Sequence, residues 1–166
     1  MTQDMTVENF LDSVTSEVFA DKFTPVPAGD YTNGRVKPNS LTIRSVDFKN
    51  GRFGKELELE ILIDDEAAKA ATGMAEPSVR WRSLLDFTRD LTADDVAPGA
   101  ALPPLASGTN KNVKLGALRS ALGQNTAPWS FRNLDGAGPI PNVKVKHVQD
   151  KRDAEKVYAE VAAVSK

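Results

Sequence analysis

The sequence predicts a mostly β fold with one main helix, and three patterns carry that prediction. Apolar residues at 57, 59, 61 and 63 alternate with glutamates at 56, 58 and 60, which is the two-residue period of a half-buried strand. Asn50-Gly51, just before this run, is a strong signal for a β-hairpin. Apolar side chains between Val113 and Leu122 recur near helical spacing, and Gly123 then provides a natural helix stop.

The first 22 residues predict an acidic amphipathic arm. Its apolar residues recur in steps of three and four, as on one face of a helix, at Val7, Phe10, Leu11, Val14 and Val18. Thr6 is placed to cap this helix. The two prolines and the glycine of residues 23–30 then predict a linker into a folded domain over residues 31–166.

Two strand-like segments begin that domain, at residues 30–37 and 41–48. They are either one long strand broken at Pro38 or two short strands. After the hairpin signal comes the alternating strand described above. A short helix over residues 66–74 and a strand over residues 79–87 are expected next.

The second half of the chain predicts a loop, the main helix and two strands. Residues 88–110 are rich in Pro, Gly, Ala and Asp, and a loop of this length is either functional or mobile. The main helix is expected within residues 110–125 and another alternating strand within residues 140–148. Residues 155–164 fit a helix or a strand, and we favour a strand because it completes the architecture.

The order strand, strand, strand, helix, strand, strand is that of an OB-fold, a five-stranded Greek-key barrel. Other small β-barrels and sandwiches with one helix remain alternatives. An OB-fold binds oligonucleotides on its second and third strands and with the loops joining strands one–two and four–five. Here those loops are residues 49–54 and 149–156, and both carry basic side chains.

Composition excludes several classes of protein. A chain of 166 residues fits one domain with a real core. With no cysteine and one histidine, we expect neither an enzyme nor a bound metal or cofactor. No apolar run reaches the roughly 20 residues of a membrane helix, and the acidic N-terminus lacks the order of a signal peptide. We therefore expect a cytoplasmic protein with no membrane partner.

The net charge of −2 conceals an uneven distribution. Residues 1–30 carry six acidic side chains and one basic side chain, a net charge of −5. Residues 111–152 carry eight basic and two acidic side chains, a net charge of +6. A basic carboxyl half behind an acidic arm fits a polyanion partner, although a solvated surface with random charge clustering gives the same count.

Three segments resemble a family of bacteriophage proteins found in replication and recombination modules, long labelled only as a domain of unknown function. "FTPVPAGDY" at 23–31 is similar to the family's entry to its first strand, and "NVKLGALRSALG" at 112–123 resembles its helix. "LDGAGPIPNVKVKHVQDKRDAEKVYAEVAAV" at 134–164 resembles its closing hairpin. The resemblance implies an OB-like fold, single-stranded DNA binding and, for a phage protein, the host cytoplasm.

The chain departs from many such proteins because it ends "AAVSK", without an acidic carboxyl tail that recruits partners. The acidic N-terminal arm is then the expected contact with replication or recombination proteins. A homo-oligomer is also compatible with the sequence.

The stretch "SVRWRSLLDF" at 78–87 supports two hypotheses. Trp81 between Arg80 and Arg82 fits a base stacked on an indole with its phosphates held by guanidiniums. The same alternation fits a strand with Trp81 in the core and the two arginines paired with the glutamates of the preceding strand. We favour a mixed outcome, in which Trp81 is structural and the arginines contribute to the binding groove.

The other candidate residues follow the same requirement for cations and exposed aromatic rings. Trp129 and Phe131 either stack on bases or plug the end of the barrel, and Lys144 and Lys146 alternate with buried valines. The complete set of candidate nucleic-acid-binding residues is Arg35, Lys37, Arg44, Arg52, Phe53, Lys55, Arg80, Arg82, Trp129, Phe131, Arg132, Lys144, Lys146, Lys151 and Arg152.

Two functions follow from these observations. The first is sequence-independent binding of single-stranded DNA, which protects DNA intermediates in phage replication or recombination. The alternative is a structural or adaptor protein of a phage that uses a β-barrel for protein–protein contacts. The basic carboxyl half and the strand order favour DNA, whereas the glutamates at 56, 58 and 60 favour the adaptor.

Overall fold

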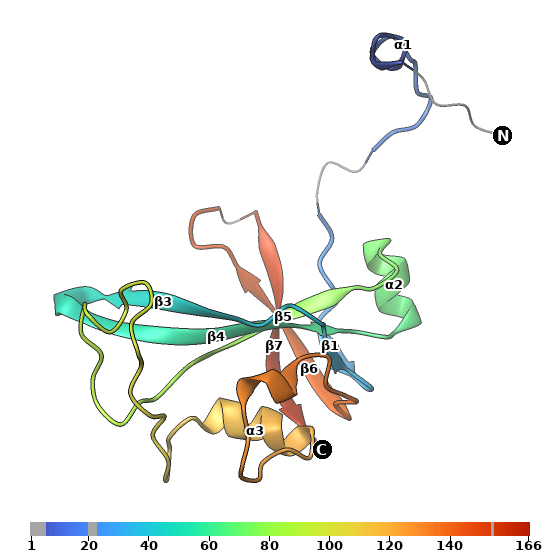
Figure 1. Ribbon diagram of the computed structural model, residues 1–166. Coiled ribbons are helices and arrows are strands. Elements are labelled where there is room, and N and C mark those ends of the chain that lie inside the picture. The colour runs from blue at the N-terminus through green and yellow to red at the C-terminus, as the bar shows by residue number, and fades with distance from the viewer. Residues whose placement is uncertain (1–5, 20–22, 154) are drawn as a thin grey trace.

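The computed structural model describes residues 6–19, 23–153 and 155–166, and within them the chain is mostly β (Figure 1). Seven strands form one sheet, and three short α-helices accompany them. The strands are β1 (Gly29–Tyr31), β2 (Arg35–Val36), β3 (Thr42–Phe48), β4 (Arg52–Leu62), β5 (Ser78–Leu84), β6 (Asn142–Gln149) and β7 (Val157–Ser165). The α-helices are α1 (Val7–Leu11), α2 (Glu66–Thr72) and α3 (Val113–Ala121), with short 3-10 turns at Lys49–Gly51 and Phe131–Leu134.

The sheet is mixed, and its hydrogen-bonded order is β1-β6-β7-β5-β4-β2, with β3 also paired to β4. The β5–β7 pair is parallel and the other pairs are antiparallel. This order confirms the mostly β prediction, the main helix and the strand favoured for the C-terminal segment. The path runs from β1 to β2 without closing, so the closed five-stranded barrel expected from the sequence is not what the sheet order shows.

The larger number of strands has a local cause. Asn33 and Asn39 adopt left-handed backbone conformations, with φ of 58° and 62°, which interrupt the extended chain. Pro38 has no N–H group to donate to a neighbouring strand. The long strand expected between residues 30 and 48 is therefore divided into β1, β2 and β3.

The alternation in β4 and β5 separates the sheet into an inner and an outer face. Leu57, Leu59 and Ile61 are fully buried on the inner face, and the register places Trp81 of β5 beside Leu59. Trp81 is 1% exposed, so the structural hypothesis for this tryptophan is confirmed. Burying each such aliphatic side chain contributes roughly 1.5–3 kcal/mol, which makes this inner face the main source of stability.

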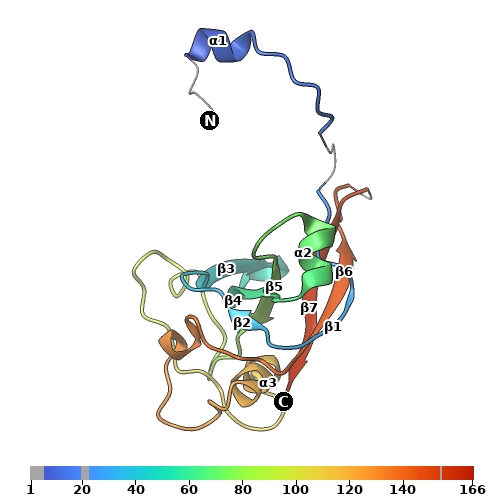
Figure 2. The same cartoon turned by 90° about the vertical axis from the view of Figure 1, so that its right-hand side faces the viewer.

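The helices of the folded body have recognisable starts and stops. In α2, the Asp65 carboxylate accepts a hydrogen bond from the Ala68 N–H at 2.9 Å, and Gly73 ends the helix in a left-handed conformation. In α3, Leu115 and Leu118 are buried in the core, and the helix packs against β7. Both helices were expected from the sequence. Figures 1 and 2 show α3 at the end of the body opposite the N-terminal arm.

The N-terminal helix is shorter than expected. Thr6 caps it as predicted, accepting a hydrogen bond from the Asn9 N–H at 3.2 Å, but α1 ends at Leu11 instead of continuing to Val18. Among the described arm residues, none of the α1 side chains is buried, and Val18 is 97% exposed. A short helix whose apolar side chains do not pack against the rest of the protein has marginal stability in water. This explains why α1 ends at Leu11. Residues 1–5 and 20–22 of the expected arm lie outside the described residues.

The expected linker is anchored to the body rather than free. Val26 is 3% exposed and belongs to the hydrophobic core. Its carbonyl oxygen lies 2.8 Å from Nε2 of His147, and the Tyr31 hydroxyl donates to the Pro27 carbonyl. The folded body therefore begins near Val26, before the boundary at residue 31 that the sequence suggested.

The long loop between β5 and α3 is irregular, as predicted, but side chains organise it. Arg89 donates two hydrogen bonds to the Asp95 carboxylate, each 2.8 Å long. The Asn112 N–H donates to Asp86 at 2.7 Å, and the Asn112 side-chain oxygen accepts from the Asp86 N–H at 2.7 Å. These two sets of hydrogen bonds order the loop. It lies against the end of the β3–β4 hairpin, where Leu91 forms an isolated β-bridge with Phe53.

Candidate nucleic-acid interface

One outward face of the sheet gathers charged side chains from five neighbouring strands. Paired residues of adjacent strands project from the same face, so the register shows which side chains share it. We call this surface the charged face and define it as Arg44 of β3, Glu56, Glu58 and Glu60 of β4, Arg80 and Arg82 of β5, Glu160 of β7, and Lys144 and Lys146 of β6.

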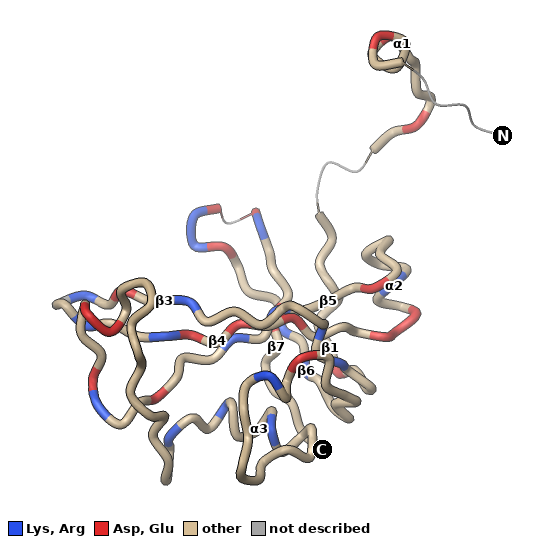
Figure 3. Tube along the Cα trace, viewed as in Figure 1, with Lys and Arg blue, Asp and Glu red and all other residues tan. Residues whose placement is uncertain are grey.

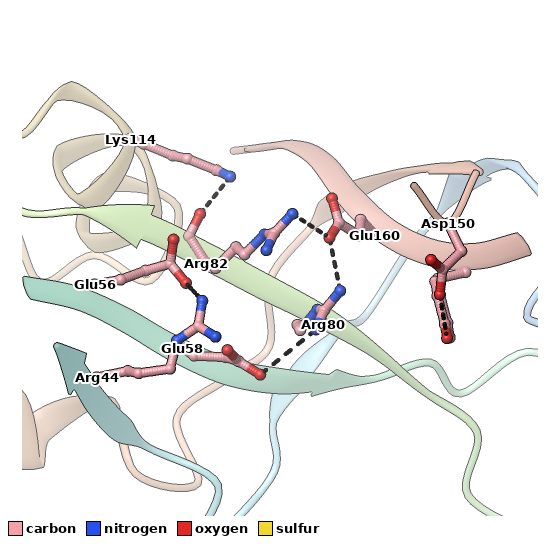
Figure 4. Close-up of polar contacts among 9 residues, drawn as sticks. Arg44, Glu56, Glu58, Arg80, Arg82, Lys114, Asp150 and Glu160 are labelled. Carbon is pink, nitrogen blue, oxygen red and sulfur yellow. Dashed lines mark hydrogen bonds and ion pairs between the residues drawn. The ribbon is translucent and has the colours of Figure 1, made fainter. Parts of the chain in front are cut away.

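Glu160 lies at the centre of the charged face. Its Oε1 atom is 3.0 Å from Nη2 of Arg80 and 3.0 Å from Nη2 of Arg82 (Figure 4). Glu160 is only 7% exposed, whereas the two arginine side chains are more than one-third exposed. A buried carboxylate is stable only when cations or hydrogen-bond donors compensate its lost hydration. Glu160 therefore holds the two guanidiniums side by side.

One glutamate of β4 also contacts Arg80, at a longer distance than Glu160 does. The register sets Glu58 beside Arg82 and Glu60 beside Arg80, as the sequence suggested. The ion pair that forms between these strands, however, joins Arg80 to Glu58 at 4.0 Å. The closer carboxylate is Glu160, which sequence reasoning missed because it belongs to a parallel strand 80 residues further along the chain.

Two further ion pairs extend the charged face toward β2 and β3. Arg44 lies 2.8 Å from Glu56, and the Arg44 side chain is 58% exposed. Lys37 lies 3.8 Å from Glu60 just after β2. The guanidinium of Arg44 carries five N–H donors, so one contact with Glu56 leaves donors available to a phosphate.

Lys144 and Lys146 occupy the β6 side of the charged face. Both are exposed, and they alternate with the buried Val143 and Val145, as the sequence predicted. Lys146 is the cross-strand partner of Glu160. The two lysines thus continue the row of cations beyond Arg80 and Arg82.

Lys114 of α3 is a second residue near this face that sequence reasoning missed. Its Nζ atom donates to the Arg82 carbonyl oxygen and lies 5.4 Å from the centroid of the Trp81 ring. Partial burial lowers the pKa of Lys114, and the positive charges of Lys146 and Arg82 act in the same direction, while Glu160 opposes them. The sequence alone does not reveal this contact, because the long loop between β5 and α3 leaves the position of α3 relative to β5 undetermined.

The candidate residues of the β3–β4 hairpin are divided between two faces. Arg52 is exposed at the start of β4. Phe53 and Lys55 alternate to the face opposite Glu56, where Lys55 donates to the Ser45 hydroxyl at 2.7 Å. Figure 3 shows the basic residues of this hairpin at one end of the molecule.

Trp129, Phe131 and Arg132 do not lie on the charged face. The two rings form an edge-to-face pair with centroids 5.1 Å apart, and both pack against the hydrophobic core. The Arg119 guanidinium lies 4.2 Å from the Trp129 ring centroid, and Trp129 Nε1 donates to Gln124 at 3.1 Å. Because one ring is covered and both are partly buried, this pair fits the plug hypothesis better than base stacking. Arg132 is exposed beside it.

The remaining candidates lie at the margins of the sheet. Arg35 of β2 donates to the Gly136 carbonyl at 3.0 Å and packs on Gly138, where a Cβ atom would lie 3.2 Å from Arg35. Lys151 and Arg152 are exposed in the turn between β6 and β7 (Figure 3). In that turn Asp150 accepts hydrogen bonds from the Arg152 N–H and the Tyr158 hydroxyl, which lower the pKa of Asp150.

The described residues form neither of two other kinds of site. Within the described part of the chain, no group of three or more His, Asp or Glu side chains is placed to hold a metal ion. None of the described helices has the length and apolar character needed to cross a membrane. Comparison with known proteins found no family model, no curated protein and no solved structure that matches this chain.

Proposed function

We propose that this protein binds single-stranded DNA without sequence preference, through the charged face. In this proposal it covers DNA intermediates during phage replication or recombination, in the host cytoplasm. It needs no catalytic group or cofactor. The observation that carries the proposal is the convergence of exposed cations from β3, β5 and β6 on one face of a small β domain.

The strand pairing supports an OB-like arrangement for this domain. β1, β2 and β3 belong to one continuous stretch, residues 29–48, which pairs with β6 at its start and with β4 at its end. The two ends of the open sheet path are thus formed by neighbouring parts of the same stretch. The parallel β5–β7 pair and the position of α3 between β5 and β6 also match an OB-fold. We propose that residues 29–48 act as the bent first strand of such a fold.

The ion pairs on the charged face are compatible with phosphate binding. Arg80, Arg82 and Arg44 each have side chains between 37% and 58% exposed, so their remaining N–H donors face solvent. Arginine binds phosphate through charge-assisted, often bidentate hydrogen bonds. The interleaved glutamates reduce the positive potential, so we expect binding of moderate strength that is strongly weakened by salt.

The same glutamates favour a second candidate function, a structural or adaptor role. Each arginine on the charged face has a carboxylate within 4.0 Å. A surface with both signs of charge suits a complementary protein partner as well as a polyanion. In that case the protein would not bind oligonucleotides, and the charged face would contact another protein.

Nuclear magnetic resonance with isotope-labelled protein and unlabelled oligo-dT separates the two functions. We expect oligo-dT to shift the amide signals of residues 44, 80–82 and 144–146, because these backbone groups lie under the proposed contacts. The amides of α2 serve as an internal control and should not move. Absence of shifts on the charged face, with the protein folded, would contradict DNA binding there and favour the adaptor function.

A further inference from the structure

Phe48, the last residue of β3, lies with its ring on the backbone of β4. A Cβ atom built on Gly54 would come within 2.8 Å of Cε2 of Phe48 and 3.2 Å of Cδ1 of Leu84. These approaches are too close for a side chain, so the glycine is what allows the ring to rest on the strand. One face of the ring thus packs against β4, and Phe48 as a whole residue is still 38% exposed.

The ring continues the charged face rather than the core. Phe48 is four residues from Arg44 on the same strand, so the two-residue period places both side chains on one face. Leu84, two residues beyond Arg82 on β5, also projects from this face and is 45% exposed. An exposed aromatic ring beside an exposed leucine thus lies at the end of the row of cations.

Charged side chains of both signs surround Phe48 and Leu84. A pocket of about 470 Å³ is lined by Phe48, Gly54 and Leu84 together with the basic Arg52 and Lys111. Two acidic residues, Asp86 and Asp90, also line it, and the Asp86 carboxylate accepts a hydrogen bond from the Asn112 N–H. Both of these basic residues are exposed. Arg89 also lines the pocket, but its guanidinium is held by Asp95. Beside these two carboxylates, the pocket therefore offers an open aromatic surface and two exposed cations, which are the groups that contact the bases and phosphates of a single strand.

We propose that Phe48 stacks on a base of single-stranded DNA, with Arg52 and Lys111 holding the neighbouring phosphates. This inference rests on the proposed function and adds the base contact that the ion pairs of the charged face cannot supply. Gly54 acts as the support of the ring. The strand would run from Lys144 and Lys146 across the arginines to Phe48.

The test compares oligo-dT with an abasic oligonucleotide of the same length and charge, by fluorescence anisotropy at low salt. The wild-type protein should bind oligo-dT more tightly than the abasic strand. Phe48→Ala should weaken oligo-dT binding roughly 5- to 150-fold, the equivalent of one stacked base, and leave the abasic affinity nearly unchanged. Phe48→Trp should retain the preference.

Two variants control for packing. Phe48→Leu keeps an apolar cover on Gly54 but has no aromatic ring, so it should lose the preference while its melting temperature stays close to that of the wild type. Ile43→Ala removes a side chain of similar exposure, 44%, from the opposite face of β3 and should not change either affinity.

The outcomes separate this inference from the proposed function. Equal binding of both oligonucleotides by the wild type would overturn stacking and leave phosphate binding intact. Full oligo-dT preference in Phe48→Leu would also overturn it. Failure of the wild type to bind either oligonucleotide would overturn both proposals.

Discussion

Glu160 and Arg80 are direct cross-strand partners in the parallel β5–β7 pair, and their side chains form a 3.0 Å ion pair. They are 80 residues apart in the sequence. The same carboxylate oxygen also contacts Arg82. A single buried acid thus fixes the spacing of the two most central cations on the proposed DNA-binding face.

The first prediction concerns Glu160→Gln. The amide oxygen can still accept hydrogen bonds from the arginines, while the charged face gains one net positive charge. We expect single-stranded DNA affinity to rise about threefold at low salt, from a Coulomb change of about 0.6 kcal/mol at roughly 7 Å in water. The free energy of unfolding should fall by about 1–3 kcal/mol, because the hydrogen bonds from both arginines lose their charged acceptor.

Anisotropy titrations and urea unfolding measure these two effects. Glu76→Gln makes the same charge change at an exposed position after α2 and should alter neither quantity appreciably. Weaker DNA binding by a folded Glu160→Gln protein would show that the carboxylate itself, and not only its hydrogen bonds, positions the arginines.

The second prediction concerns Trp81. Its side chain is 1% exposed in the core, so Trp81→Ala should create a large cavity and destabilise the domain by roughly 3–5 kcal/mol. DNA binding should be lost only through unfolding, and it should return under conditions that restore the fold. A variant with unchanged stability and lost binding would contradict the core role.

The third prediction concerns salt. If Lys144 and Lys146 contact phosphates, changing both to Ala should reduce the slope of log affinity against log salt by about one unit or more, since each contact on a single strand contributes about 0.7. Lys69→Ala with Lys166→Ala removes the same charge elsewhere and should leave the slope unchanged. An unaltered slope in the first pair would place these lysines outside the site.

The fourth prediction concerns the acidic arm. Residues 1–22 carry five acidic side chains and one basic side chain. We predict that this negative charge competes with DNA for the charged face. Deleting them should tighten DNA binding at low salt, and the difference should fade at high salt. If affinity and fold are both unaffected, the arm contacts a replication or recombination protein or a second copy of the chain instead.

The fifth prediction concerns acid and the long loop. The Arg89 guanidinium, with further hydrogen bonds from Thr92, holds the pKa of Asp95 well below its usual value of 3.8. A carboxyl group with a depressed pKa stabilises the folded state above its unfolded pKa, and this contribution is lost as pH falls. Stability should therefore decline below about pH 4, and Asp95→Asn should be less stable at neutral pH with a shallower acid decline. The melting temperatures of the wild type and Asp95→Asn measured against pH test this prediction. Identical pH profiles for the two proteins would show that the Arg89–Asp95 ion pair does not contribute to stability.

The local patterns of the sequence predicted the faces of the sheet well. Alternation in residues 56–63 and 79–82 placed Leu57, Leu59 and Trp81 inside and the charged residues outside, as found. These assignments depend only on the two-residue period of a strand. The same is true of Lys144 and Lys146.

Those local patterns could not predict contacts between segments that are distant in the sequence. The role of Glu160 depends on the parallel pairing of β5 with β7, and no local period encodes that pairing. The sequence analysis named Phe53 as a candidate and did not consider Phe48, for a related reason. Which of the two rings joins the charged face depends on the length of the turn at Lys49–Gly51, which sets the hairpin register.

Binding of single-stranded DNA by this protein can be measured in one titration of the full chain. Labelled oligo-dT and a duplex of equal length are each titrated at low salt, with anisotropy as the readout. We expect micromolar or tighter binding of oligo-dT, much weaker binding of the duplex, and loss of oligo-dT binding as salt is raised. No binding of oligo-dT at micromolar protein and low salt would contradict it.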